Sequence, residues 1–185
     1  MCVLCIIPAG HNLPSKEDLK AMHRANPHGM GFVSKSLHYK GMNFDKFYNR
    51  LQFVPKNESI IIHFRFATHG SICAKNCHPF NKGSIWFAHN GILDIAPRED
   101  MTDSETAFRD ILYPIAREYG LDSKELHATV DEVIGYSKFA FLDEETGNVY
   151  TFGNFQDYKG MLCSNLNWVR HTYQRPYYSR AWYYV

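Results

Sequence analysis

Cys2 is the residue whose position most directly suggests chemistry. It follows Met1 and opens the short apolar run 2–7. Removal of Met1, which the small side chain of Cys2 permits, would leave a thiol and a free α-amine on one residue. A terminal amine of this kind ordinarily has a pKa of about 7.7–8.0, so it can act as a base near neutral pH. The alternative is a buried strand cysteine, since thiols in apolar runs commonly pack as hydrophobes.

Other chemically useful side chains are concentrated in the middle of the chain. Arginine binds a carboxylate through two parallel hydrogen bonds, and an aspartate can hold an ammonium group. An Asn-Gly pair offers one side-chain donor and one unshielded backbone donor to a developing oxyanion. The segments concerned are HFRFATHG (63–70), NCHPF (76–80), HNG (89–91) and TDSET (102–106).

Each of these residues also has a structural interpretation. Arg65 could pair with a buried carboxylate, as many arginines do. Asn90 and Gly91 form a dipeptide that is typical of a hairpin turn. Asp103 could be a helix N-cap, and it could serve both purposes at once. Local hydrogen bonding accounts better than base catalysis for the three histidines, His63, His78 and His89.

The order and spacing of these motifs resemble the class II glutamine amidotransferases, which are glutaminase domains of the N-terminal-nucleophile hydrolase superfamily. The matching patterns are H-x-R-x-A-T-x-G, N-x-H-P and H-N-G behind an N-terminal cysteine, and they extend from Cys2 to about Thr106. The resemblance implies an α+β fold, a four-layer αββα sandwich of two antiparallel sheets with Cys2 at the start of a central strand. His28 departs from the pattern, because the family often has an acidic residue there, and its role stays open.

The resemblance also implies a reaction and a role for each matching position. Cys2 would attack the side-chain amide of L-glutamine and form a thioester, which water would resolve into glutamate after ammonia has left. Asn90 and Gly91 would form the oxyanion hole. The substrate-binding residues would be Arg65 for the α-carboxylate, Asp103 for the α-ammonium, and Thr68 and His69 beside Arg65.

The elements that must position these residues follow from patterning and turn signals, which indicate a layered α+β architecture. In the strand 59–67, alternation places His63 and Arg65 on the face opposite the apolar residues Ile60, Ile62 and Phe64. Residues 39–41 are predicted as a turn. The other predicted strands are 2–7, 29–33, 85–89, 139–142, 149–152 and 161–163. Helices are predicted from Ser15, Asn43, Asp103 (with a kink or break near Pro114) and Asp122.

Length and composition agree with a single glutaminase domain over residues 1–185, ending in an aromatic tail at 171–185. A net charge of +1 offers no basic face to nucleic acid. No apolar run reaches the roughly 20 residues that span a bilayer, and no basic segment precedes the first apolar run, so we expect no membrane partner and a cytoplasmic protein. Five cysteines without an export signal indicate reduced thiols. We expect no cofactor and no metal.

Several alternatives stay open. Cys2, Cys5, Cys73, Cys77 and His78 have spacings seen in zinc sites, although residues three apart in a strand point to opposite faces. A related hydrolase of γ-glutamyl amides or peptides would use the same head-group clamp, and a catalytically inactive binding module would keep the fold alone. Because the chain after Asp103 is needed to complete the sandwich, we expect any ammonia acceptor to be a separate synthase, with the aromatic tail as a docking surface or as part of the core.

Overall fold

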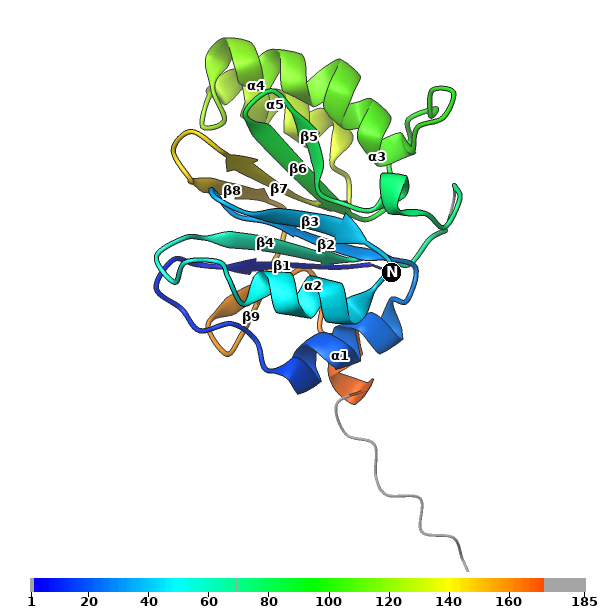
Figure 1. Cartoon of the computed structure of the whole chain (residues 1–185). Coiled ribbons are helices and arrows are strands. Elements are labelled where there is room, and N and C mark those ends of the chain that lie inside the picture. Colours follow the sequence, from blue (N-terminus) through cyan, green and yellow to red (C-terminus); the bar gives the residue numbers. More distant parts are fainter. Residues whose placement is uncertain (1, 69, 172–185) are drawn as a thin grey trace, which may run out of the picture.

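The computed structural model describes residues 2–68 and 70–171. Two antiparallel sheets are stacked face to face, and helices cover the outer face of each sheet (Figure 1). The first sheet has the strand order β3-β2-β4-β1-β10-β9, and the second has the order β5-β6-β7-β8. This arrangement confirms the predicted α+β sandwich of two antiparallel sheets.

The strands of the first sheet come from both ends of the described chain, since the early strand β1 pairs with β4 on one side and with the late strand β10 on the other. They are β1 (Val3–Ile7), β2 (Met30–Val33), β3 (His38–Gly41), β4 (Ile60–Phe64), β9 (Gln156–Tyr158) and β10 (Met161–Cys163). The strands of the second sheet are β5 (Phe80–Lys82), β6 (Ile85–Asn90), β7 (Lys138–Asp143) and β8 (Val149–Phe152).

The sequence-based assignment of strands needs three changes. Residues 39–41, predicted as a turn, lie in β3, where pairing of Gly41 with Met30 overrides the local turn signal. The short strands β5 and β9 are absent from the prediction, since three residues carry little periodicity. The predicted strand 59–67 ends at Phe64, so Arg65 lies just beyond the sheet.

Helices α1 (Lys16–Ala25) and α2 (Phe44–Leu51) cover the first sheet and begin at the predicted caps. The side chain of Ser15 accepts a hydrogen bond from the N–H of Asp18, and that of Asn43 accepts one from Lys46. A short 3₁₀ helix, Asn167–His171, follows β10. None of the helices in the described part of the chain has the length and apolar character needed to cross a bilayer.

The second helical layer starts at α3 (Asp103–Thr106) and continues through a π-helical turn (Ala107–Leu112) into α4 (Tyr113–Tyr119). The wide turn lies immediately before Pro114, the predicted kink, where the missing N–H and the ring of proline prevent regular α-helical bonding to the preceding turn. Gly120 ends α4 with a φ of 95°. Helix α5 (Lys124–Val133) is capped by Ser123 instead of the predicted Asp122.

Three apolar cores hold the four layers together, one on each outer face and one between the sheets. Strand β1 supplies two of them by alternation: Val3, Cys5 and Ile7 face the helices, whereas Leu4 and Ile6 face the second sheet. Strand β4 alternates in the same way, as predicted. Because residues of β1 and β6 pack together in the core between the sheets, this core fixes the position of β1 relative to β6. It consists of Leu4, Ile6, Val33, Ile61, Trp86, Ala88, Ala140 and Leu142.

Leu4 offers a test of this central core, because its side chain is fully buried. We expect Leu4→Ala to lower the free energy of unfolding by about 2–5 kcal/mol, since it removes buried methyl groups and leaves a cavity. Phe53→Ala is the control, because Phe53 is 76 % exposed, and it should change that free energy by less than about 0.5 kcal/mol. Urea denaturation measures both, and equal effects would contradict the assignment of this core.

Candidate active site

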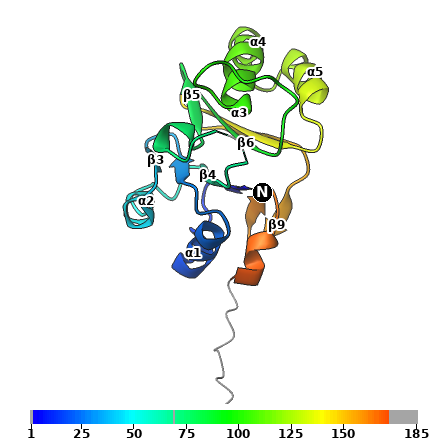
Figure 2. The ribbon, with the colours of Figure 1, turned by 90° about the vertical axis from the view of Figure 1, so that its right-hand side faces the viewer.

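Five of the predicted site residues line one cavity of about 40 Å³: Cys2, Arg65, Thr68, Gly91 and Asp103. They come from the start of β1, the end of β4, the end of β6 and the start of α3, which meet at one edge of the sandwich (Figures 1 and 2). The remaining lining residues are Phe66, Ala67, His78, His89, Thr102 and Ser104. Segments far apart in sequence thus converge on the Cys2 thiol.

The half-buried thiol of Cys2 is held against the backbone of Phe66. The N–H of Phe66 donates to Sγ at 3.3 Å, and the thiol in turn lies 3.5 Å from the carbonyl oxygen of Phe66. Burial raises the pKa of the Cys2 thiol, and the Phe66 N–H and the charge of Arg65 oppose that rise only in part. The thiol is therefore protonated at neutral pH and needs a base before it can act as a nucleophile.

Arg65 is buried at the wall of the cavity, with only 4 % of its surface exposed. Its Nη1 donates to the carbonyl oxygen of Ser71 at 2.9 Å, which fixes the plane of the guanidinium. Asn76 donates to the same carbonyl at 3.0 Å, so the loop after β4 is tied to the arginine it surrounds. A planar, oriented guanidinium of this kind suits a carboxylate ligand.

Asp103 is the first residue of α3, and its two carboxylate oxygens are held by different groups. Oδ2 accepts from the N–H of Leu93 at 3.3 Å, and Oδ1 accepts from the hydroxyl of Ser104 at 3.3 Å. Thr102, not Asp103, is the N-cap, since the Thr102 hydroxyl accepts from the N–H of Glu105. Asp103 is thus not needed as a cap, and its half-buried carboxylate faces the cavity.

Asn90 and Gly91 end β6, but they do not reach the cavity equally. Gly91 lines it with a φ of 152°, and a Cβ there would lie 2.1 Å from the hydroxyl oxygen of Ser137. Only glycine fits this position. Asn90 is 4 % exposed and lies behind the cavity wall, where its Nδ2 donates to Ser164 Oγ at 2.6 Å.

Three buried histidines are grouped at the cavity, and two of them, His78 and His89, line it. The ring centroid of His78 lies 4.4 Å from that of His63 and 6.3 Å from that of His89. Burial, reinforced by the charge of His89, lowers the pKa of His63 to about 3, and burial lowers the pKa of His89 to about 4 against the opposing charge of Asp103. The pKa of His78 is also well below its ordinary value, because it is buried beside both. All three rings are neutral at pH 7.

The comparisons with known proteins agree with this geometry. The family model for class-II glutamine amidotransferases matches residues 49–154, which is more than half of the chain. This chain belongs to the class-II glutamine amidotransferases. A solved structure with a similar fold is the glutamine phosphoribosylpyrophosphate amidotransferase from B. subtilis, complexed with ADP and GMP, with a TM-score of 0.57 and 15 % sequence identity. The alignment covers 93 % of this chain and 43 % of that one. A search among curated proteins finds no match.

The structure shows contacts near the candidate site for several residues whose role the sequence left open. His28, whose role was open, accepts the N–H of Ala67 on Nδ1 at 3.0 Å and packs its ring against Phe66 at 5.0 Å, so it supports the loop that contacts Cys2. His89 reaches Asp103 through Ser104, whose hydroxyl lies 2.7 Å from His89 Nδ1. His69 lies outside the described residues, as does the tail from residue 172 onward.

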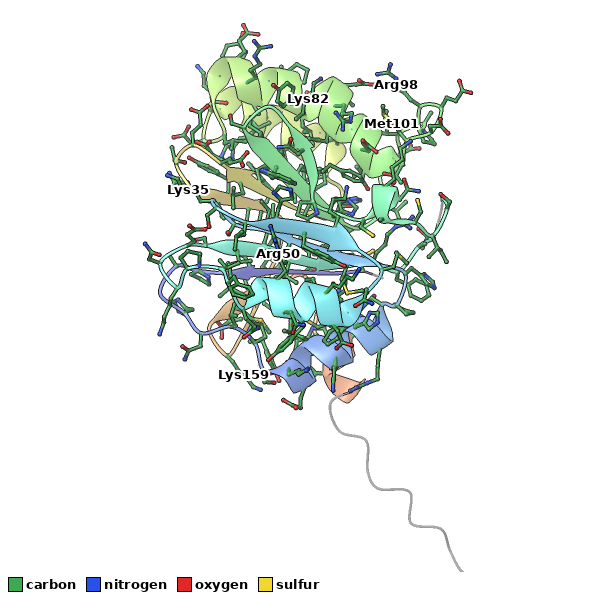
Figure 3. All side chains as sticks on the ribbon, viewed as in Figure 1. Lys35, Arg50, Lys82, Arg98, Met101 and Lys159 are labelled. Carbon is green, nitrogen blue, oxygen red and sulfur yellow. The ribbon has the colours of Figure 1, made fainter. Side chains whose placement is uncertain are left out.

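The segment between β6 and α3 forms the outer side of the site. Arg98 anchors it twice, through its N–H to the hydroxyl of Thr106 at 3.0 Å and through an ion pair with Asp110 at 2.7 Å. Figure 3 shows Arg98 and Met101 on this segment beside α3, at the edge where β1 begins. The ion pair is exposed, whereas Leu93 of the same segment is buried in the core against the helices, so this side of the candidate site is held both from the surface and from within.

A second cavity and a pair of buried cysteines lie apart from the cavity beside Cys2. A larger cavity of about 690 Å³ is lined by Tyr113, Arg117 and Asp143 and contains none of the predicted residues. Cys5 is buried with its sulfur 3.2 Å from that of Cys163, on the face of β1 that packs against the helices. Within residues 2–68 and 70–171 no three potential metal-binding side chains are grouped to hold an ion.

The buried neutral histidines predict how the stability of the amidotransferase depends on pH. In the unfolded chain they bind a proton below about pH 6.5, whereas folded His63 and His89 stay neutral down to about 3 and about 4. The free energy of unfolding should therefore fall as pH drops below 6.5, by about 1.4 kcal/mol per pH unit for each such histidine. Urea denaturation between pH 7 and 4.5 measures this slope.

His63→Gln should make that slope shallower, because it removes one of the protons taken up on unfolding. His11→Gln, at an exposed position, is the matched control. An unchanged slope in His63→Gln would show that this ring is protonated in the folded state.

Proposed function

We propose that this chain hydrolyses the side-chain amide of L-glutamine to glutamate and ammonia, with Cys2 as the nucleophile. The observation that carries the proposal is the convergence of the Cys2 thiol, Gly91, Arg65 and Asp103 on one cavity. These groups supply a nucleophile, a backbone donor for an oxyanion, a cation for a carboxylate and an anion for an ammonium. A zwitterionic amino acid with a side-chain amide needs all four.

The first step requires a base, because burial keeps the Cys2 thiol protonated. The buried histidines are poor bases at neutral pH, since their pKa values are lowered. Removal of Met1 would provide one, the α-amine of Cys2 itself. The amine takes the thiol proton, sulfur bonds to the amide carbon, and the proton passes to the leaving nitrogen as the C–N bond breaks and ammonia departs. Water then attacks the thioester, giving glutamate and restoring the thiol.

The tetrahedral intermediate places a negative charge on the former amide oxygen. The backbone N–H of Gly91 is the donor nearest to that oxygen, because Gly91 lines the cavity and carries no side chain to cover its amide. The side-chain amide of Asn90, one residue earlier, is the second donor. One such donor typically contributes a factor of roughly 10²–10³ in rate.

The head group of the substrate lies between Arg65 and Asp103. Arg65 binds the α-carboxylate and Asp103 the α-ammonium, and Thr68, which lines the cavity, and His69 complete the proposed substrate-binding set. Support comes from the fixed orientation of both charges by Ser71 and Ser104. The cavity, at about 40 Å³, is far smaller than the roughly 150 Å³ that accommodates benzene.

This chain aligns with 43 % of the length of the structural relative. We infer that the released ammonia passes to a synthase that binds the acceptor. A hydrolase of γ-glutamyl amides, which shares the same head group, is the competing activity, and it differs only in the group that leaves.

Cys2→Ala should abolish production of glutamate and ammonia from L-glutamine, because no other group can form the thioester. Cys73→Ala, which removes another half-buried thiol, should keep the activity within about twofold. Coupled assays for both products measure this, with γ-glutamyl amides as parallel substrates. Faster hydrolysis of these amides than of L-glutamine would identify them, instead of glutamine, as the substrate.

The intact mass of the active enzyme should correspond to the chain without Met1. Active protein that retains Met1 would rule out the α-amine as base. Wild-type protein that hydrolyses neither class of substrate, alone or with a cognate synthase, would contradict the proposed activity.

The two head-group charges should affect substrate binding. Arg65→Lys and Asp103→Asn should each raise KM for L-glutamine by about 10–100-fold. The first loses one of two parallel hydrogen bonds to the carboxylate and the second loses the charge opposite the ammonium, each worth about 1.5–3 kcal/mol. Arg98→Lys, at the exposed ion pair with Asp110, is the matched control and should leave KM within twofold. Unchanged KM values in the first two variants would place the head group elsewhere.

A further inference from the structure

We propose that Ser164 is a positioning residue, which orients the side-chain amide of Asn90 so that its nitrogen faces the oxyanion. The inference rests on the proposed hydrolysis and adds a residue from outside the range matched by the family model. No motif marks it in the sequence, because Ser164 simply follows the short strand β10.

Ser164 is fixed to the first strand on two sides. Its N–H donates to the carbonyl oxygen of Leu4 at 2.8 Å, and its Oγ accepts the N–H of Leu4 at 3.0 Å. The next residue, Asn165, donates to the carbonyl oxygen of Cys2 at 2.8 Å and accepts from the N–H of Asn167 at 3.2 Å. The position of the Ser164 hydroxyl relative to Cys2 is therefore set by the backbone.

The Asn90 amide has one satisfied end and one unsatisfied end. Its Nδ2 lies 2.6 Å from Ser164 Oγ, whereas its Oδ1 is buried without a partner among the described residues. Ser164 Oγ already accepts from Leu4, and its own hydroxyl proton is available for donation. Both groups are left with an unused hydrogen-bonding capacity in this orientation.

A half-turn of the Asn90 amide about its Cβ–Cγ bond gives a partner to both the buried oxygen and the Ser164 hydroxyl proton, and it leaves Nδ2 as the unpaired end. The Ser164 hydroxyl then donates to Oδ1, and Nδ2 takes the place of the unpaired oxygen. In that orientation the nitrogen is the free end, and it can donate to the oxyanion beside the N–H of Gly91. Without the hydroxyl, nothing in the described structure selects this orientation over the opposite one.

Ser164→Ala tests this role through steady-state kinetics with L-glutamine. We expect kcat to fall about 10–100-fold, a part of the roughly 10²–10³ that one oxyanion donor supplies, while KM stays within twofold because Arg65 and Asp103 are untouched. In an Asn90→Ala background, Ser164→Ala should reduce kcat by less than twofold more, since the amide it orients is already absent.

Ser34→Ala is the matched control. Ser34 is equally buried, and its hydroxyl bonds to the backbone of Leu37 away from the cavity, so kcat should stay within twofold. Equal losses of kcat from Ser164→Ala with and without Asn90 would show a merely structural role. An active wild type with a fully active Ser164→Ala variant would also overturn the inference.

A neutron structure of the wild-type protein separates this inference from the proposed function, because it locates the amide deuterons without any assay. Deuterons of Asn90 directed at the cavity support the positioning role even if glutamine proves not to be the substrate. Deuterons directed at Ser164 overturn it even if glutamine is hydrolysed.

Discussion

The antiparallel pairing of β1 with β4 and β10 is the interaction on which the site depends. Val3 pairs with Phe64 and Cys5 pairs with Cys163, so the start of β1 lies beside the end of β4 and just past the end of β10. The backbone of Phe66, two residues beyond its paired neighbour, consequently meets the Cys2 thiol. The proposed nucleophile is thus placed by backbone pairing of β1, and its thiol is held by the backbone N–H of Phe66.

The electrostatics of the site follow from a second constraint, the burial of imidazole rings where two sheets meet. His63 donates from Nε2 to the carbonyl oxygen of His89, which crosses from the first sheet to the second. Because that ring is neutral, it adds no positive charge of its own beside Arg65. His63 and His89 each make one ring hydrogen bond, as expected from sequence, whereas neither ring nitrogen of His78 has a partner among the described residues.

The motifs made the family and five of the cavity-lining residues predictable from sequence, together with the sandwich and the caps at Ser15 and Asn43. Their spacing alone could not show how the ends of strands align. The predicted strand 59–67 is too long because its alternation continues to Ala67, although sheet pairing stops at Phe64. Ser164 is unpredictable for a related reason, since its role arises from a contact 74 residues away in sequence with Asn90, and no local pattern encodes such a contact.

The proposed nucleophile and the proposed backbone donor to the oxyanion come from different sheets. Cys2 immediately precedes β1 of the first sheet, whereas Gly91 immediately follows β6 of the second, where Ser137 closes the space beside it. Their separation is therefore set by how closely the sheets approach. Ala88 and Ala140, paired across β6 and β7 in the central core, keep that approach close because their side chains are small. Packing between the sheets thereby determines whether a thiol and a backbone donor can act on the same amide.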